Sequence, residues 1–267
     1  MNAIAFVTAN YVARQLGYHM TEGWGQGDQA TQAHFRPAST FEERLSELFA
    51  EIKGLGFTAV DLWTAHLHWS WATPEHLAAV RRVANEHGLT ITGYAGGFGD
   101  TPEEFELACR TAATIGARVL AGGTTADRTD RAAVIALLEE HDLKLGFENH
   151  PEKSPADLLA RIGGESNGRI GAAIDTGWWG TQGYDAAQAI RELAPQLVAL
   201  HLKDVRAAGS HQTCRFGEGV VPIRACVDAV KAVGYTGAIS IEHEPDQGDP
   251  IPDIAASLAL LQGWIAA

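Results

Sequence analysis

The chain has 267 residues, of which 46% are hydrophobic and 20% are charged. This length and composition exclude a disordered chain and are typical of one large α/β domain. The formal net charge of −13 argues against a general nucleic-acid-binding protein, because phosphate binding requires clusters of lysine and arginine and the sequence has none.

Neither the N-terminus nor the cysteines indicate export or a membrane. Residues 1–6 lack the basic region and long apolar core of a secretory signal. No uncharged apolar run approaches the roughly 20 residues that span a bilayer. Cys109, Cys214 and Cys226 are scattered and lack CxxC spacing, as is typical of reduced cysteines. We therefore expect a cytoplasmic protein with neither a membrane nor nucleic acid as partner.

The chain begins with a short strand and a long polar stretch. Residues 4–10 are mostly apolar, as in a buried parallel strand. Residues 17–39 are rich in glycine and glutamine, and we expect a long loop there. Because such loops are often functional and this one contains Trp24, we predict a lid over a substrate. Thr40 and Glu43 then form a capping-box signature, which predicts the start of a helix.

Strands and helices alternate from there to the end of the chain. Proline follows threonine or serine at several helix starts, where its missing N–H costs nothing. The later predicted strands are residues 57–63, 90–94, 117–121, 144–148, 170–175, 197–201 and 238–242. The predicted helices are residues 40–54, 74–87, 101–116, 130–141, one starting at 154, and 185–193, 222–233 and 252–265.

Eight strand–helix units predict an α/β fold with a single closed (β/α)8 barrel over residues 1–267. Strands that alternate with helices form a parallel sheet with right-handed crossovers. An open, doubly wound sheet would carry a GxGxxG fingerprint after the first strand, and the sequence lacks it. In such a barrel the chemistry lies at the carboxyl ends of the strands.

Four successive predicted strands end in metal-binding side chains: Glu148, Asp175, His201 and Glu242. Two glutamates, an aspartate and a histidine suit one divalent cation of the Mn, Co, Mg or Zn type, with Mn favoured. Each residue considered alone has a simpler explanation. Asp175 would cap a turn, His201 would be a core histidine, and Glu242 would form an ion pair with Lys203. Their equivalent positions in four successive units favour one metal site.

The C-terminal half also resembles a known family. The matching stretches are AAIDTG at 172–177, HLKDVR at 201–206, GEGVV at 217–221 and GYTGAISIE at 234–242. They resemble the sugar isomerase/epimerase family with a xylose-isomerase-like TIM barrel, which includes tagatose 3-epimerases and, most similar here, the inosose dehydratases. The resemblance implies one divalent cation bound by the same four residues, and proton exchange between the two glutamates and the substrate carbon.

One position departs from the family pattern. The family often has histidine three residues after the strand-six aspartate, whereas this chain has Trp178. Because an indole donates one hydrogen bond and cannot bind a metal, this argues against the multinuclear zinc site of related abasic-site DNA endonucleases. A glutamate expected near the second strand is also missing, and His66 or His68 is the candidate for that space.

These residues predict a divalent-metal-dependent sugar or cyclitol isomerase or epimerase. Proton abstraction next to a metal-polarised carbonyl would give an enediolate intermediate. Glu148 or Glu242 is the expected base, and His150 is a further catalytic candidate. The residues expected to contact the substrate are His66, Trp178, Lys203 and Arg206.

Three alternatives stay open. A lyase or dehydratase would expel a β-hydroxyl or β-glycosyl group and would need a general acid such as His150, His66 or Lys203. A phosphodiesterase like the abasic-site endonucleases is disfavoured by Trp178 and by the negative net charge. A non-catalytic barrel could instead serve as a partner subunit, and the sequence does not address homo-oligomers.

Overall fold

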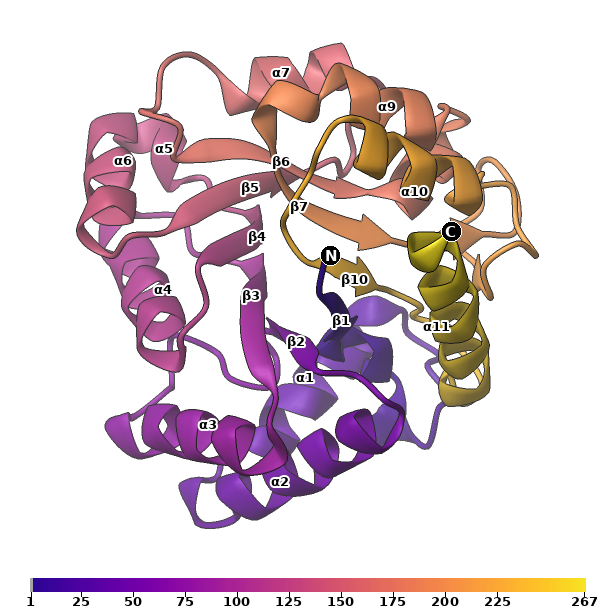
Figure 1. Cartoon of the computed structure of the whole chain (residues 1–267). Helices are drawn as coiled ribbons and strands as arrows, with labels where there is room; N and C mark the ends of the chain where they lie inside the picture. The colour runs from indigo at the N-terminus through magenta and orange to yellow at the C-terminus, as the bar shows by residue number, and fades with distance from the viewer. Residues whose placement is uncertain (1) are drawn as a thin grey trace.

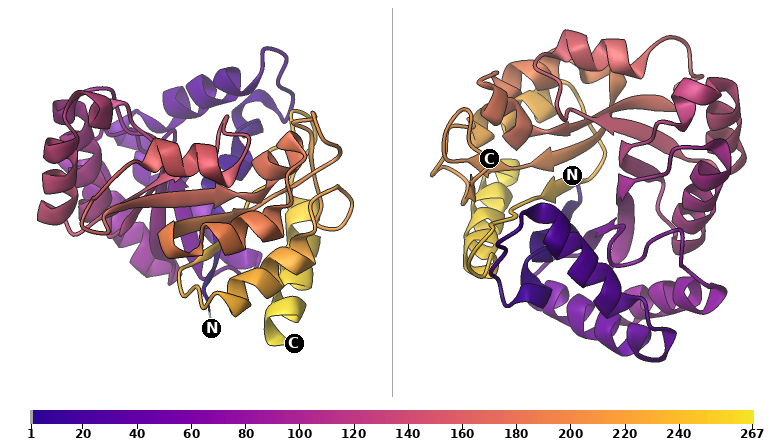
Figure 2. Two further views of the ribbon diagram at one scale, coloured as in Figure 1. Left: turned by 90° about the horizontal axis from the view of Figure 1, so that it is seen from above. Right: turned by 180° about the vertical axis from the view of Figure 1, so that it is seen from behind.

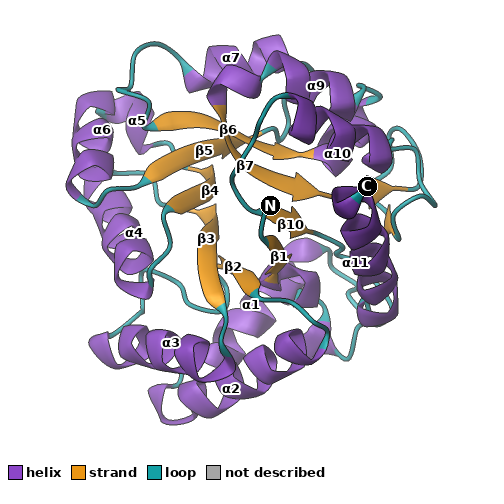
Figure 3. Cartoon of the chain, in the orientation of Figure 1, coloured by secondary structure: helices purple, strands orange, loops and turns teal. Residues whose placement is uncertain are grey.

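The computed structural model describes residues 2–267. Eight parallel strands form a closed barrel in the order β1, β10, β7, β6, β5, β4, β3, β2. The ring closes where β1 (Ile4–Val7) pairs with both β2 (Ala59–Trp63) and β10 (Ile239–Ile241). Helices surround the ring of strands (Figure 1 and Figure 3). The predicted (β/α)8 barrel is confirmed.

The remaining elements agree with most of the predicted ranges to within a few residues. The other barrel strands are β3 (Thr90–Gly97), β4 (Val119–Gly123), β5 (Lys144–Glu148), β6 (Ile170–Asp175) and β7 (Leu197–Leu202). The outer helices are α2 (Ala38–Gly54), α3 (Pro74–His87), α4 (Pro102–Ile115), α6 (Arg131–Glu140), α7 (Pro155–Ile162), α9 (Ala186–Glu192), α10 (Ile223–Ala232) and α11 (Ile251–Ala266).

Side-chain caps explain why several helix starts are readable from the sequence. The side chains of Thr101, Asp130 and Ser154 accept backbone N–H groups at the starts of α4, α6 and α7. Each cap satisfies a donor that the helix itself leaves unpaired. The strands are readable for a different reason: β2 and β6 are buried along their whole length, as parallel strands covered on both faces are.

The expected loop at 17–39 is mostly helical, so this part of the prediction was wrong. Helix α1 (Trp24–Phe35) follows the short 3-10 helices η1 (Thr8–Tyr11) and η2 (Arg14–Leu16). Its buried residues Gly27, Thr31 and Phe35 recur every four positions, which gives the helix one packed face. Gly27 has no side chain, and this allows close contact with the backbone of Val12.

Helix α2 also starts differently from the prediction. Pro37 occupies the N-cap position, and no side chain caps the helix. The Thr40 hydroxyl donates to the carbonyl of Pro37 at 3.4 Å, so the predicted capping box with Glu43 is wrong. Proline at the preceding position fixes the chain direction and starts the helix two residues early, at Ala38.

Short elements that the sequence did not predict lie in the connections between strands and helices. They are α5 (Ala126–Thr129), α8 (Thr176–Gln182), η3 (Ala194–Gln196) and the hairpin of β8 (Asp204–Val205) with β9 (Thr213–Cys214). The two chain ends lie at the face of the barrel opposite α1 (Figure 2). Within residues 2–267, no helix has the length and apolar character needed to cross a membrane.

Candidate active site

The strand register brings the predicted ligands to one face of the barrel wall. Glu148 on β5 pairs with Ala173 on β6, and Asp175, two residues further along β6, pairs with His201 on β7. The partner of His201 on β10 lies two residues before Glu242. Because paired residues point the same way and side chains alternate along a strand, all four predicted ligands share one face.

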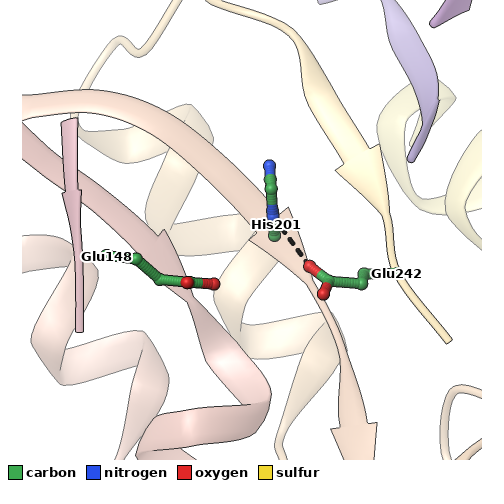
Figure 4. A group of neighbouring side chains, drawn as sticks. All are labelled: Glu148, His201 and Glu242. Atoms are coloured by element: carbon green, nitrogen blue, oxygen red, sulfur yellow. Dashed lines mark hydrogen bonds and ion pairs between the residues drawn. The ribbon is translucent and has the colours of Figure 1, made fainter. Parts of the chain in front are cut away.

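Three of the four lie within metal-binding reach of one another. Glu148, His201 and Glu242 each offer one ligand atom, and these atoms all lie within 4.8 Å of one another. The two glutamates point toward each other from different strands, with His201 beside Glu242 (Figure 4). Oxygen and imidazole donors suit a divalent cation of the predicted type. The residues present therefore fit a bound cation.

Asp175, the fourth predicted ligand, is engaged by the protein itself. Its Oδ1 accepts the backbone N–H groups of Gly177 at 2.7 Å and Trp178 at 3.3 Å, which caps α8. Its Oδ2 lies 3.3 Å from Nζ of Lys203. Asp175 therefore lies beside the other three residues and stabilises the loop after β6, and its role as a ligand stays a prediction.

Lys203 is the basic centre of this region. Its buried ammonium group lies 3.0 Å from Glu242, 2.8 Å from Glu244 and 3.3 Å from Asp175. Burial opposes the charge on Lys203, but these three carboxylates raise its pKa well above the usual value. The ammonium group therefore stays charged and holds the three carboxylates together.

Sequence reasoning missed Asp61, a buried aspartate in the middle of β2. Its Oδ2 lies 2.8 Å from Nε2 of His201, while Nδ1 of the same ring lies 2.7 Å from Oε2 of Glu242. Ser240 donates a second hydrogen bond to Asp61, at 3.3 Å. The sequence does contain a signal for this role of Asp61. An acidic residue between Val60 and Leu62 in an apolar strand should be buried, and a buried carboxylate requires a partner.

Five carboxylates surround this centre: Asp61, Glu148, Asp175, Glu242 and Glu244, called the acidic cluster below. Within residues 2–267, the basic side chains bonded to it are Lys203 and His201, and Trp24 and Ser240 each donate one uncharged hydrogen bond. The cluster therefore carries excess negative charge. A divalent cation at the three-residue set would offset much of this charge.

The pKa values of the two glutamates that face each other are shifted in opposite directions. Burial, together with the charges of Asp175 and Glu242, raises the pKa of Glu148 to about 8. Burial also opposes ionisation of Glu242, but Lys203 and His201 offset it and lower its pKa far below the usual range. In the metal-free protein, one glutamate therefore holds a proton at neutral pH while the other is ionised.

Cation binding is expected to release at least one proton near neutral pH. The carboxylate of Glu148 must be ionised to bind a metal, and its pKa of about 8 keeps it protonated below that pH. Affinity should therefore rise with pH by about tenfold per pH unit for each proton released, and the contribution of Glu148 should level off above about pH 8. Calorimetric titration with Mn²⁺ in buffers of different ionisation enthalpy measures the protons released. Proton release unchanged in Glu148→Gln would contradict this assignment.

Two buried asparagines hold the strand ends that carry the site. Asn149 accepts the N–H of Asp175 at 2.7 Å and donates to its carbonyl at 2.9 Å, which joins β5 to β6. Asn10 donates to the carbonyl of Ile241 at 3.1 Å and accepts the N–H of His243 at 2.7 Å. Backbone groups on both sides of Glu242 are thus fixed, and the carboxylate is aimed inward.

A cavity of about 520 Å³ opens over these residues. Its lining includes the predicted residues Glu148, His150, Trp178, Lys203 and Glu242. The other lining residues are Trp24, Gly177, Thr181, Val205, His211, Thr213, Glu244 and Asp246. The volume lies within the usual range of small-molecule sites. Trp24, from the segment predicted as a lid, thus reaches the cavity from α1.

His150 and Trp178 form an aromatic wall. Their rings stack with centroids 3.8 Å apart, and His211 meets Trp178 edge-on at 4.9 Å. Burial and the nearby charges of Lys203 and His211 lower the pKa of His150. His150 is therefore a neutral ring at neutral pH. It lies where it can contact a substrate, and its catalytic role stays a prediction.

Two predicted substrate contacts do not reach this cavity. His66 is buried, lies against Phe35 at 4.7 Å, and has a pKa lowered to about 3 by burial. Arg206 is half-exposed and lies 3.4 Å from Glu218. Among residues 2–267, neither belongs to the cavity wall, so the structure gives these two predictions no support. The side chain that β2 contributes to the site is instead Asp61, which bonds to His201.

Most of the other tryptophans serve packing. Trp69 donates to the carbonyl of Gly97 at 2.8 Å, Trp71 donates to Gln32 at 3.2 Å, and Trp179 is fully buried.

Burial raises the pKa of the Cys214 thiol to about 11, which makes it a poor nucleophile.

The fold and the site together define the class: a (β/α)8 barrel with clustered carboxylates and a histidine at the carboxyl ends of its strands. A family model described as the xylose isomerase-like TIM barrel matches residues 49–264. The chain belongs to this family, which confirms the resemblance seen in the sequence.

Known relatives agree with this placement. L-ribulose-5-phosphate 3-epimerase UlaE of Escherichia coli is 35% identical over 71 residues, which cover 27% of this chain and 24% of that protein. The match thus spans about a quarter of the curated relative.

Solved structures match over longer stretches. An L-ribulose 3-epimerase has a TM-score of 0.67 at 15% identity, with 100% of this chain and 95% of that chain covered. A D-tagatose 3-epimerase-like protein has a TM-score of 0.66 at 17% identity, with coverage of 79% and 89%. The 3-keto-D-glucoside 4-epimerase YcjR of E. coli has a TM-score of 0.63 at 18% identity, with coverage of 82% and 94%. At these identities the likeness concerns the fold.

Proposed function

We propose that this protein is a divalent-metal-dependent sugar epimerase or isomerase that removes a proton next to a carbonyl. The observation that carries the proposal is the pair Glu148 and Glu242, which point toward each other beside His201 in a substrate-sized cavity. Two carboxylates on different sides of one point can act on the two faces of one substrate carbon. Relatives named as epimerases support the same reaction class.

The cation would be held by Glu148, His201 and Glu242, with Asp175 as a further candidate. When bound, it supplies Lewis-acid polarisation of a carbonyl and lowers the energy of the enediolate. Glu242 is ionised at neutral pH because Lys203 and His201 lower its pKa, so its carboxylate is free to accept a proton. Glu148 faces it and is placed to hold or return the proton from the other side.

The surrounding residues orient these two groups. Lys203 links Glu242 to Glu244 and Asp175, and Asp61 fixes the ring of His201. Return of the proton to the same carbon gives an epimer, and return to the neighbouring carbon gives an isomer. Elimination would need a donor on the leaving-group side. The epimerases among the relatives favour the first two outcomes over the predicted lyase alternative.

Hydrogen exchange tests the reaction class directly. Protein loaded with Mn²⁺ in D₂O should introduce deuterium next to the ketone in at least one member of a panel of ketoses and inososes. NMR or mass spectrometry measures the exchange, and protein stripped with a chelator is the control. Absence of exchange across the panel, with stoichiometric metal bound, would contradict the proposal.

A further inference from the structure

The cavity has an acidic wall. Glu148, Glu242, Glu244 and Asp246 all line it. Among the described lining residues, the cavity has one lysine and no arginine. That lysine, Lys203, already lies within 3.3 Å of three carboxylates, so its ammonium donors are engaged by the protein.

The charge stays negative even when a cation is bound. With all five carboxylates ionised, the acidic cluster outweighs Lys203 and one divalent cation by two charges, with His201 neutral as a ligand. Asp246 adds a further carboxylate to the cavity wall. Proteins bind phosphate groups mainly through arginine, lysine and backbone N–H groups. A sugar phosphate would therefore meet repulsion here rather than a binding site.

The uncharged parts of the wall suit a neutral sugar. Trp24 and Trp178 offer indole surface from α1 and α8. Trp24 is 43% exposed, and its N–H lies 3.3 Å from Glu244, so an indole and a carboxylate stand side by side. A sugar ring can lay its C–H face on an indole while its hydroxyl groups donate to carboxylates. Ionised carboxylates only accept hydrogen bonds, which matches hydroxyl donors.

We propose that the substrate is an uncharged sugar, a ketose or keto-glycoside without a phosphate group, and that the acidic wall excludes phosphorylated sugars. This inference rests on the proposed function and specifies its substrate class. A neutral substrate would distinguish this chain from the relative named for L-ribulose 5-phosphate, which the chain matches over 71 residues.

A matched ligand pair tests the inference. Mn²⁺-loaded full-length protein is titrated with L-ribulose, D-tagatose and a 3-keto-glucoside, and with L-ribulose 5-phosphate, at low and high salt. Quenching of tryptophan fluorescence reports binding, because Trp24 and Trp178 line the cavity. At least one neutral sugar should bind on the order of tenfold or more tighter than the phosphate ester, with little salt dependence. Tighter binding of the ester, or no binding by any neutral sugar, overturns the inference.

A charge-reversal variant adds a second readout. Asp246→Lys should raise the affinity ratio of the phosphate ester to the neutral sugar on the order of tenfold, because it replaces repulsion by attraction. The matched control Asp228→Lys changes an exposed acid on α10, paired with Arg224 and away from the cavity, and should leave the ratio unchanged. Equal ratios in the two variants overturn the inference.

The two proposals fail in different ways. Neutral sugars that bind without any deuterium exchange would contradict the proposed epimerase or isomerase and leave the substrate class standing. Exchange that occurs only with the phosphate ester would support the reaction class and overturn the acidic-wall inference.

Discussion

Replacing either Glu148 or Glu242 by glutamine is expected to lower kcat by roughly 10²- to 10⁴-fold, the usual contribution of a positioned general base or acid. Glutamine keeps the size of the side chain but cannot accept the substrate proton. Because the two carboxylates face each other across the site, each should serve one face of the substrate carbon.

The two variants should therefore differ in partial reactions. Each should still exchange a proton in one of the two epimers, and the exchanging epimer should differ between Glu148→Gln and Glu242→Gln. Turnover and deuterium exchange are measured at saturating Mn²⁺, with bound metal checked by elemental analysis. Glu218→Gln is the matched control, because Glu218 pairs with Arg206 and Arg215 outside the cavity. Normal turnover in either site variant would remove that glutamate from the mechanism.

Asp61→Asn is expected to weaken cation binding by roughly 10- to 100-fold, as is usual when the partner of a metal-binding histidine is lost. Asp61 lies 2.8 Å from Nε2 of His201 and so leaves Nδ1 directed toward Glu242. Asparagine retains the shape but loses the charge. The imidazole then becomes a weaker ligand and its orientation is held less firmly.

Two measurements separate this role from general damage to the fold. Competition with a chelator gives the dissociation constant, and NMR of the imidazole protons gives the His201 pKa, which should fall in Asp61→Asn. Burial opposes protonation of His201, whereas Glu242 and Asp61 raise its pKa. Ser240→Ala removes only the 3.3 Å hydrogen bond to Asp61 and should change affinity far less. Unchanged affinity together with an unchanged His201 pKa would show that Asp61 does not position the ring.

The sequence by itself determined the order of the barrel strands and outer helices and most of the acidic centre. Burial periodicity marks the strands, and local caps such as Ser154 mark the helices, because both signals arise within a few residues of chain. Strands in a parallel barrel end at one face, so acidic and histidine side chains at successive strand ends pointed to one site. The sequence therefore predicts that Glu148, His201 and Glu242 lie together, as they do in the structure.

Contacts between distant parts of the chain were decided only by the tertiary structure. Asp61 and His201 are 140 residues apart, and they meet because closure of the barrel places β2 next to β1, which leaves only β1 and β10 between β2 and β7. Sequence periodicity records which face of an element is buried, but not which partner it meets. The same limit hid the burial of His66. Register and ring closure, rather than local pattern, fixed how the acidic centre is held and what surrounds it.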